Sequence, residues 1–320
     1  MQPRIVFMGS PEFALPTLRA LVGCYPVVGV VTQPDRPAGR GRKLTPPPVK
    51  LLAQALGLPV IQPRRLREPE AMEQLRAWAP ELIAVAAFGQ ILRPEVLDLP
   101  RHGCVNVHAS LLPRWRGAAP VQAALLHGDQ QTGVTIMRMD PGIDTGPILS
   151  QRAVPIEPEE TAGELSGRLA QVSANLLIET LPAYLSGELQ PTSQDDRLAT
   201  YAPMLGKAAG WLDFTQPAEA LARQVRAFNP WPGAFTHWQG AALKVHRAHA
   251  VEATVDPDTE PGQAVVTLGQ PAILTGRGLL VLDQVQPAGK KPMPGKDFLQ
   301  GARGWEGARL AKLTPASPDG

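Results

Sequence analysis

Residues 103–117 read G-C-V-N-V-H-A-S-L-L-P-R-W-R-G, and the first half of this stretch has the alternation of a buried β-strand. Asn106 and His108 alternate with valines, and residues two apart on a strand point to the same face. A proline five residues after His108 marks a turn, so the polar pair lies near the carboxyl end of the strand. Ligands bind at that end of the strands in open parallel sheets. The sequence therefore predicts an amide and an imidazole side by side at a ligand-binding edge.

Asn106 and His108 suit two kinds of chemistry. Placed together they can polarise a carbonyl group or move a proton during a reaction. The alternative is structural, because buried amide and imidazole groups often only satisfy nearby backbone. Cys104 precedes them on the same stretch, and we expect a buried strand cysteine there rather than a nucleophile.

Apolar runs on both sides of this strand predict a doubly wound, mostly parallel α/β sheet of the Rossmann-like kind. Strands are expected at residues 4–8, 26–32, 59–62, 81–88 and 133–139, an edge strand at 148–156, and helices at 13–22, 51–56, 69–77, 118–126 and 159–187. The first strand and helix are joined through Gly9 alone, whereas a dinucleotide fingerprint needs three glycines. We therefore do not expect an NAD site.

The pattern changes in the last third of the chain. Residues 189–206 have no hydrophobic periodicity and are expected to be a linker. Residues 207–314 hold one helix, at 217–228, followed by short strands separated by glycine and proline. Such strands predict a small antiparallel β-barrel, similar to the oligonucleotide-binding (OB) fold. We expect a first domain at 1–188 and a second at 207–314.

Residues 34–50 form a cationic segment. It contains five lysine and arginine residues against one aspartate, which gives a net charge of +4. Its prolines, at 34, 37 and 46–48, are expected to exclude regular structure. Arginine forks match phosphate groups, so the segment suits a nucleic-acid backbone. The alternative is a solvated, flexible loop with no partner.

The composition of the whole chain limits the classes of protein to which it can belong. The net charge of +2 is too small to indicate a nucleic-acid partner, so any basic surface must be local. Cys24 and Cys104 have no metal-ligand spacing, so neither a disulfide framework nor a metal site is expected. The N-terminus lacks the features of a secretory signal, and no apolar run has the length of a transmembrane helix. We expect a cytoplasmic protein.

Three motifs, in this order, resemble the folate-dependent formyltransferases. They read H-A-S-L-L-P at 108–113, R-W-R-G-A-A-P at 114–120 and D-P-G-I-D-T-G at 140–146. The resemblance covers nearly the whole chain and implies a Rossmann-like formyltransferase domain followed by an OB-like domain that contacts tRNA. It implies transfer of the formyl group of 10-formyltetrahydrofolate to the α-amino group of methionine on initiator tRNA, for translation initiation. A monomer without a metal is expected.

The resemblance also implies roles for individual residues. The catalytic residues would be Asn106, His108 and Asp144. The folate donor would contact Phe88, Gly89, Ile91, Ser110, Leu111, Leu112 and Pro113. The tRNA would contact Arg36, Arg40, Arg42, Lys43, Lys244, Lys290 and Lys291. Asp140, in the same loop as Asp144, would serve as a turn residue.

Other functions stay open at this point. The acceptor could instead be a small amine, such as glycinamide ribonucleotide or an amino sugar, although the basic loop and second domain argue against this. The chain could also release formate from the same folate by hydrolysis. From a different class, it could bind RNA or folate without catalysis. The Asn106, His108 and Asp144 set argues against a non-catalytic protein.

Overall fold

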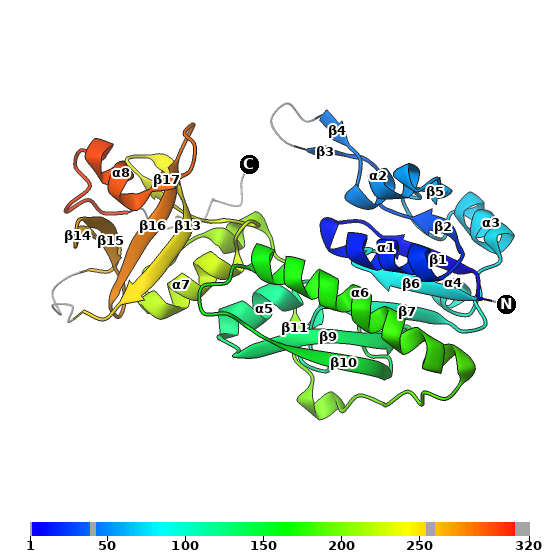
Figure 1. Cartoon of the computed structure of the whole chain (residues 1–320). Coiled ribbons are helices and arrows are strands. Elements are labelled where there is room, and N and C mark those ends of the chain that lie inside the picture. The colour runs from blue at the N-terminus through cyan, green and yellow to red at the C-terminus, as the bar shows by residue number, and fades with distance from the viewer. Residues whose placement is uncertain (1, 39–42, 254–259, 311–320) are drawn as a thin grey trace, which may run out of the picture. The chain divides into compact units, whose positions relative to one another are not determined.

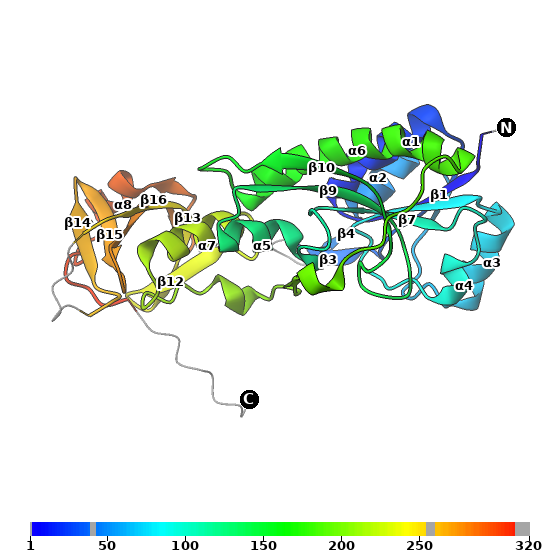
Figure 2. The same cartoon turned by 90° about the horizontal axis from the view of Figure 1, so that it is seen from below.

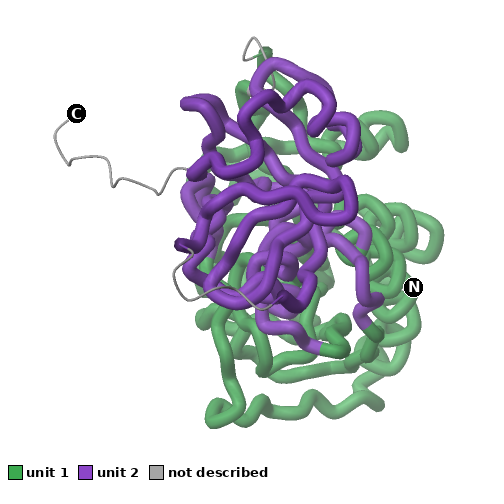
Figure 3. Tube along the Cα trace, turned by 90° about the vertical axis from the view of Figure 1, so that its left-hand side faces the viewer, with its two compact units in different colours: residues 1–121, 130–155, 165–203 green, residues 122–129, 156–164, 204–320 purple. Residues whose placement is uncertain are grey.

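The computed structural model describes residues 2–38, 43–253 and 260–310. The chain divides into two compact units, which are coloured separately in Figure 3. Unit 1 contains residues 1–121, 130–155 and 165–203, and unit 2 contains residues 122–129, 156–164 and 204–320. The domain limits of 1–188 and 207–314 stay a prediction.

Unit 1 is built on a seven-stranded sheet of order β10-β9-β7-β6-β1-β2-β5 (Figure 1). Its strands are β1 (Ile5–Gly9), β2 (Val27–Val31), β5 (Val60–Ile61), β6 (Leu82–Ala86), β7 (Cys104–His108), β9 (Gln131–Arg138) and β10 (Ile148–Pro155). The strands from β5 to β7 are parallel, while β9 and β10 are antiparallel to their neighbours. The mostly parallel α/β sheet and its edge strand β10 are therefore confirmed.

Helices cover both faces of this sheet (Figure 2). α1 (Leu15–Cys24) and α6 (Ala162–Ser186) lie on one side, and α3 (Pro69–Trp78) and α4 (Pro94–Leu97) lie on the other. The other helical segments before α6 in the chain are η1 (Glu12–Ala14), α2 (Pro48–Ala55) and α5 (Pro120–His127). Cys104 belongs to the apolar cluster on the α3 and α4 side. Since side chains alternate along β7, Asn106 and His108 project to that side too.

Gly29 of β2 lies directly against Trp78 of α3. A β-carbon at position 29 would overlap the indole ring, and Trp78 is buried in a packed cluster that leaves the ring little room. We expect Gly29→Ala to lower the free energy of unfolding by about 1–3 kcal/mol, as measured by denaturant titration. Gly23→Ala in α1 is the control, because nothing lies within 4 Å of its added carbon. Equal stability of the two variants would contradict this packing.

The cationic segment contains a short two-stranded ribbon, so the expectation that its prolines exclude regular structure is wrong. β3 (Arg36–Ala38) pairs antiparallel with β4 (Lys43–Thr45). Pro37 fits because the ribbon has only two strands and leaves one edge of each unpaired. Pro48 fits because it opens α2, where a missing N–H costs nothing. The Lys50 ammonium binds the Asp35 carboxylate at 2.8 Å beside the ribbon.

Residues 189–206, expected to link the domains, carry structure of their own. They include the 3-10 turn η2 (Asp196–Leu198) and strand β11 (Tyr201–Ala202). β11 pairs in parallel with β8 (Arg116–Gly117), which follows the turn after β7. This segment therefore lies beside the stretch that carries the sequence motifs.

Unit 2 contains a six-stranded antiparallel sheet, as expected for the C-terminal part of the chain. Five strands follow the order β12-β13-β16-β15-β14, and β17 pairs with β16. They are β12 (Ala234–Trp238), β13 (Ala241–Val251), β14 (Ala264–Thr267), β15 (Gln270–Leu274), β16 (Leu279–Pro287) and β17 (Met293–Pro294), accompanied by η3 (Lys207–Gly210), α7 (Ala218–Ala227) and α8 (Gly295–Gly301). Register shifts in β13 bend the sheet around a core that includes Phe298 and Trp305. Within the described residues, no helix is long and apolar enough to cross a membrane.

Candidate active site

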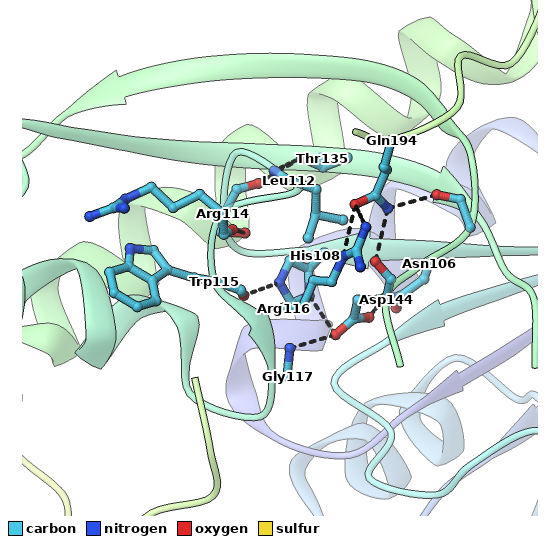
Figure 4. A network of polar contacts seen from close by, with 12 residues as sticks. Asn106, His108, Leu112, Arg114, Trp115, Arg116, Gly117, Thr135, Asp144 and Gln194 are labelled. Carbon is cyan, nitrogen blue, oxygen red and sulfur yellow. Dashed lines mark hydrogen bonds and ion pairs between the residues drawn. The ribbon is translucent and has the colours of Figure 1, made fainter. Parts of the chain in front are cut away.

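Three polar side chains meet at the carboxyl end of β7 (Figure 4). Asn106 Nδ2 donates a hydrogen bond to Asp144 Oδ1 at 3.3 Å, and His108 Nδ1 lies 3.5 Å from Asp144 Oδ2. Asn106 and His108 are 9% and 5% exposed. Both therefore face the same carboxylate, as the alternation along β7 predicts. Asp144 comes from the loop between β9 and β10 and completes the cluster.

His108 is held at both ring nitrogens. Its Nε2 lies 2.9 Å from the main-chain oxygen of Trp115. A carbonyl oxygen only accepts, so this contact assigns a proton to Nε2. Nδ1 then faces the Asp144 carboxylate, at 3.5 Å from Oδ2. The imidazole and the carboxylate are thus neighbours, which is the arrangement that a proton relay requires.

Asp144 sits in a backbone conformation that favours glycine. Its φ of 54° lies in the left-handed region, which a residue with a side chain adopts only where its surroundings impose it. The Gly117 amide donates to Asp144 Oδ2 at 2.9 Å. Gly117 itself has a φ of 112°, and a β-carbon there would meet the main-chain oxygen of Ala202 at 2.7 Å. Glycine is therefore needed for this amide to reach the carboxylate.

Asp140, four residues earlier, has a different role in the same loop. Its Oδ1 accepts hydrogen bonds from the Gly142 amide at 3.1 Å and from Thr145 Oγ1 at 2.6 Å. These contacts close a turn within the loop. Asp140 thus shapes the backbone that carries Asp144, in line with the turn role expected for it.

The turn after β7 is fixed by internal hydrogen bonds. Ser110 is fully buried, and its hydroxyl donates to the main-chain oxygen of Arg114 at 2.6 Å. Thr135 Oγ1 donates to the Ser110 carbonyl at 2.7 Å and accepts from the Leu112 amide at 3.1 Å. Ser110 and Leu112 are buried, whereas Leu111 and Pro113 are half-buried. Within the predicted folate set, Ser110 and Leu112 therefore shape the turn, and Leu111 and Pro113 are more accessible.

The residues after β6 lie at the same edge of the sheet as His108, because β6 and β7 are parallel neighbours. Gly89 has a φ of 79°, which allows the chain to turn there. Phe88 is buried and its carbonyl accepts from Gln33 Nε2 at 3.1 Å. Ile91, by contrast, is 72% exposed. An exposed apolar side chain thus follows β6, at the edge of the sheet where β7 ends.

The predicted tRNA-binding residues lie in both units. Arg36 is exposed and donates to Gln33 Oε1 at 3.1 Å, and Lys43 is exposed on β4. Arg40 and Arg42 lie outside the described residues. In unit 2, Lys244 is exposed on β13, and Lys290 and Lys291 are exposed after β16.

Gln194 contacts the loop of this site directly and Arg116 contacts Gln194, and sequence reasoning missed both. Arg116 is 2% exposed and lies in β8, between Trp115 and Gly117. Gln194 comes from the segment expected to be a linker, and it contacts the main chain of the Asp144 loop. The motif at 114–120 was a signal for Arg116, but nothing in the sequence marks Gln194.

Two further features lie close to β7 without joining the cluster. Burial raises the pKa of the Cys104 thiol to about 12, so the thiol stays neutral and is a poor nucleophile. A cavity of about 360 Å³ lies at the opposite end of β7 from His108, lined by residues that include His102, Gly103 and Arg138. In the parts of the chain that the structure describes, no group of three or more His, Cys, Asp or Glu residues could hold a metal ion.

Comparisons with known proteins agree with this architecture. The family model described as formyl transferase matches residues 4–181, and the model for the formyl transferase C-terminal domain matches residues 204–303. Methionyl-tRNA formyltransferase from Myxococcus xanthus is 52% identical over 302 residues, which is 94% of this chain and 95% of that protein. The enzyme of the same name from Halorhodospira halophila is 53% identical over 306 residues, 95% of this chain and 97% of its own length.

A solved structure shares the fold at low sequence identity. The N-formyltransferase from Helicobacter canadensis, in complex with folinic acid and dTDP-3-aminofucose, superposes with a TM-score of 0.64 and 16% identity. The match covers 90% of this chain and 100% of that one.

Proposed function

The chain belongs to the formyl transferase family, and from this we propose that it transfers the formyl group of 10-formyltetrahydrofolate to the α-amino group of methionine on initiator tRNA. The contact of both Asn106 and His108 with Asp144 carries the chemistry of this proposal. The relatives named methionyl-tRNA formyltransferase, about half identical over nearly the whole chain, support the acceptor. They do not favour a small amine. We further propose that the protein acts as a monomer in the cytoplasm, where initiator tRNA is used.

The proposed reaction makes one bond and breaks another. The amine nitrogen bonds to the formyl carbon, and the bond from that carbon to N10 of the folate breaks. The amine loses one proton and N10 gains one. A negative charge develops on the formyl oxygen in between, so the site must supply a hydrogen-bond donor and a carrier for the proton.

Asn106 is the donor in this scheme. Its Nδ2 carries two N–H bonds, and the contact with Asp144 uses one of them. The second can bind the oxygen of the tetrahedral intermediate. His108 and Asp144 carry the proton in this proposal, because Nδ1 lies 3.5 Å from Oδ2. Asp144 takes the proton from the attacking amine, and the Asp144–His108 pair gives that proton to the departing N10.

The chain's own residues fit a flat, partly apolar folate ring system at this edge. Ile91 offers an exposed apolar side chain, and Gly89 permits close approach of the backbone. The fixed turn at 110–113 gives a rigid wall next to His108. Rigid apolar walls with a few placed polar groups are typical of small-molecule sites.

The ribbon β3–β4 is proposed to bind the tRNA backbone. Asp35 pairs with Lys50. The rest of the cationic segment carries Arg36, Arg40, Arg42 and Lys43, of which Arg36 and Lys43 lie on the ribbon and are exposed. We expect Arg42→Ala to raise the KM for methionyl-tRNA while leaving the KM for the folate donor near the wild-type value. It should also lower the slope of log affinity against log salt by about one.

Arg19→Ala is the matched control for the ribbon, because Arg19 is an exposed arginine on α1 outside the predicted contacts. Filter-binding titrations at several salt concentrations measure both effects. Equal losses for folate and tRNA, or the same salt slope in Arg42→Ala as in the wild type, would remove the ribbon from the tRNA site.

A single assay tests the proposed function. Purified protein is mixed with 10-formyltetrahydrofolate and methionyl-tRNA, and formylmethionine is measured after release from the tRNA. Glycinamide ribonucleotide and an amino sugar nucleotide are supplied as competing acceptors. We expect formylmethionine as the main product. Faster formylation of a small amine, or release of free formate only, would overturn the assignment.

A further inference from the structure

Gln194 joins the loop that carries Asp144 to the rest of unit 1 (Figure 4). Its Nε2 donates to the main-chain oxygen of Asp144 at 2.8 Å and to that of Gly146 at 2.7 Å. These two bonds use both N–H groups of the amide. They hold the backbone on either side of Thr145, at the point where Asp144 adopts its left-handed conformation.

The other end of the Gln194 amide is fixed as well. Its Oε1 accepts from Arg116 Nε at 3.1 Å and from Arg116 Nη2 at 2.9 Å. Arginine only donates and carbonyl oxygens only accept, so the amide has one orientation that satisfies all four contacts. Arg116 is 2% exposed, and its Nη2 also binds Asp196 Oδ1 at 2.8 Å. The buried Arg116 guanidinium therefore fixes the orientation of the Gln194 amide, while Asp196 itself is exposed.

The same segment holds the opposite wall of the site. Thr200 Oγ1 accepts from the Trp115 amide at 2.9 Å, and β11 pairs with β8 across Tyr201 and Ala202. Trp115 supplies the carbonyl that binds His108 Nε2. Residues 194–202 therefore connect the backbone beside His108 with the backbone beside Asp144.

We infer that Gln194 is a positioning residue, which places the Asp144 carboxylate against Asn106 and His108 through the main chain of residues 144–146. The expected effect on kcat rests on the proposed function. The positioning role itself rests on the two hydrogen bonds that Gln194 donates to main-chain oxygens. It assigns a role to a segment that the sequence alone marks only as a linker.

Gln194→Glu separates the contact of Gln194 with Arg116 from its contacts with the main chain of the Asp144 loop. The glutamate carboxylate still accepts from Arg116, but it has no N–H for the carbonyls of Asp144 and Gly146 and it repels them. We expect kcat to fall about 10- to 100-fold, as for a displaced catalytic group. The KM values for folate and methionyl-tRNA should stay near the wild type, whereas the melting temperature should fall, because two hydrogen bonds to the main chain are lost. If Gln194 served only to satisfy buried Arg116, Gln194→Glu would keep full activity and Gln194→Ala would not.

Two controls make the test specific. Gln190→Ala changes an exposed glutamine of the same segment and should leave kcat unchanged. In an Asp144→Ala background, Gln194→Glu should cause no further loss, because the residue acts through Asp144. A further loss equal to that in the wild-type background would contradict the inference.

A readout without turnover distinguishes this inference from the proposed function. The Gly117 amide donates to Asp144 Oδ2, so its hydrogen exchange reports where the carboxylate lies. We expect faster exchange in Gln194→Glu and not in Gln190→Ala, measured by NMR with 15N-glycine labelling. If the wild type fails to formylate methionyl-tRNA, the proposed function is wrong but the positioning role is not. If the Gly117 amide exchanges at the same rate in Gln194→Glu as in the wild type, the positioning role is wrong.

Discussion

Replacing Asn106 by alanine is expected to lower kcat for formyl transfer about a hundred- to a thousandfold, the typical cost of losing one donor to a developing oxyanion. Asn106 points at the same carboxylate as His108 and has a second N–H to offer the substrate oxygen. Its contact is made in the transition state, so kcat should fall far more than the KM for either substrate changes. Steady-state kinetics with methionyl-tRNA measure the split.

Cys104→Ala is the matched control for this variant. Cys104 lies two residues earlier on the same face of β7, and its neutral thiol is packed among apolar side chains. We expect it to lose stability but to keep kcat within about threefold. If Asn106→Ala behaves like Cys104→Ala, Asn106 is a structural amide and not a catalytic one.

Replacing Asp144 by asparagine is expected to lower kcat about 10²- to 10⁴-fold, the range of general acid–base contributions. The new side chain keeps the shape of the carboxylate and an oxygen for the Gly117 amide. It can no longer accept a proton. The oxygen that meets the Gly117 amide is also the atom that faces His108 Nδ1, so His108 no longer has a carboxylate partner. The proton carrier is lost while the size and shape of the side chain are kept.

Asp140→Asn, in the same loop, is the control for the carboxylate. The asparagine oxygen can still accept from Gly142 and Thr145, so the turn should persist. Its kcat should stay within about threefold of the wild type. Wild-type turnover in Asp144→Asn would show that no proton passes through this residue, and the His108–Asp144 pair would have to be abandoned.

Much of the fold follows from local patterns in the sequence. Apolar runs located the strands of the parallel sheet, because such strands are buried on both faces. The alternation in residues 104–108 placed Asn106 and His108 on one face, and their shared contact with Asp144 bears that out. Short-range periodicity is sufficient for these features, since each depends on a few consecutive residues.

Features set by distant contacts were not predictable in the same way. Asp144 lies 38 residues from Asn106, on a loop without periodicity, and only the family resemblance indicated it. The ribbon β3–β4 was missed because its prolines occupy positions where a strand or a helix start tolerates them. Gln194 was missed because its role depends on hydrogen bonds with two main-chain oxygens and one arginine, which are distant from it in the sequence.

A single-turnover measurement tests the central claim most directly. Protein in excess over methionyl-tRNA is mixed with 10-formyltetrahydrofolate and quenched at short times, so that the chemical step is seen apart from binding and release. We predict rapid formylmethionine formation by the wild type, and a slowed chemical step with normal tRNA binding in Asn106→Ala, His108→Ala and Asp144→Asn. Wild-type rates in all three variants, or no formylmethionine with the wild type, would contradict the account.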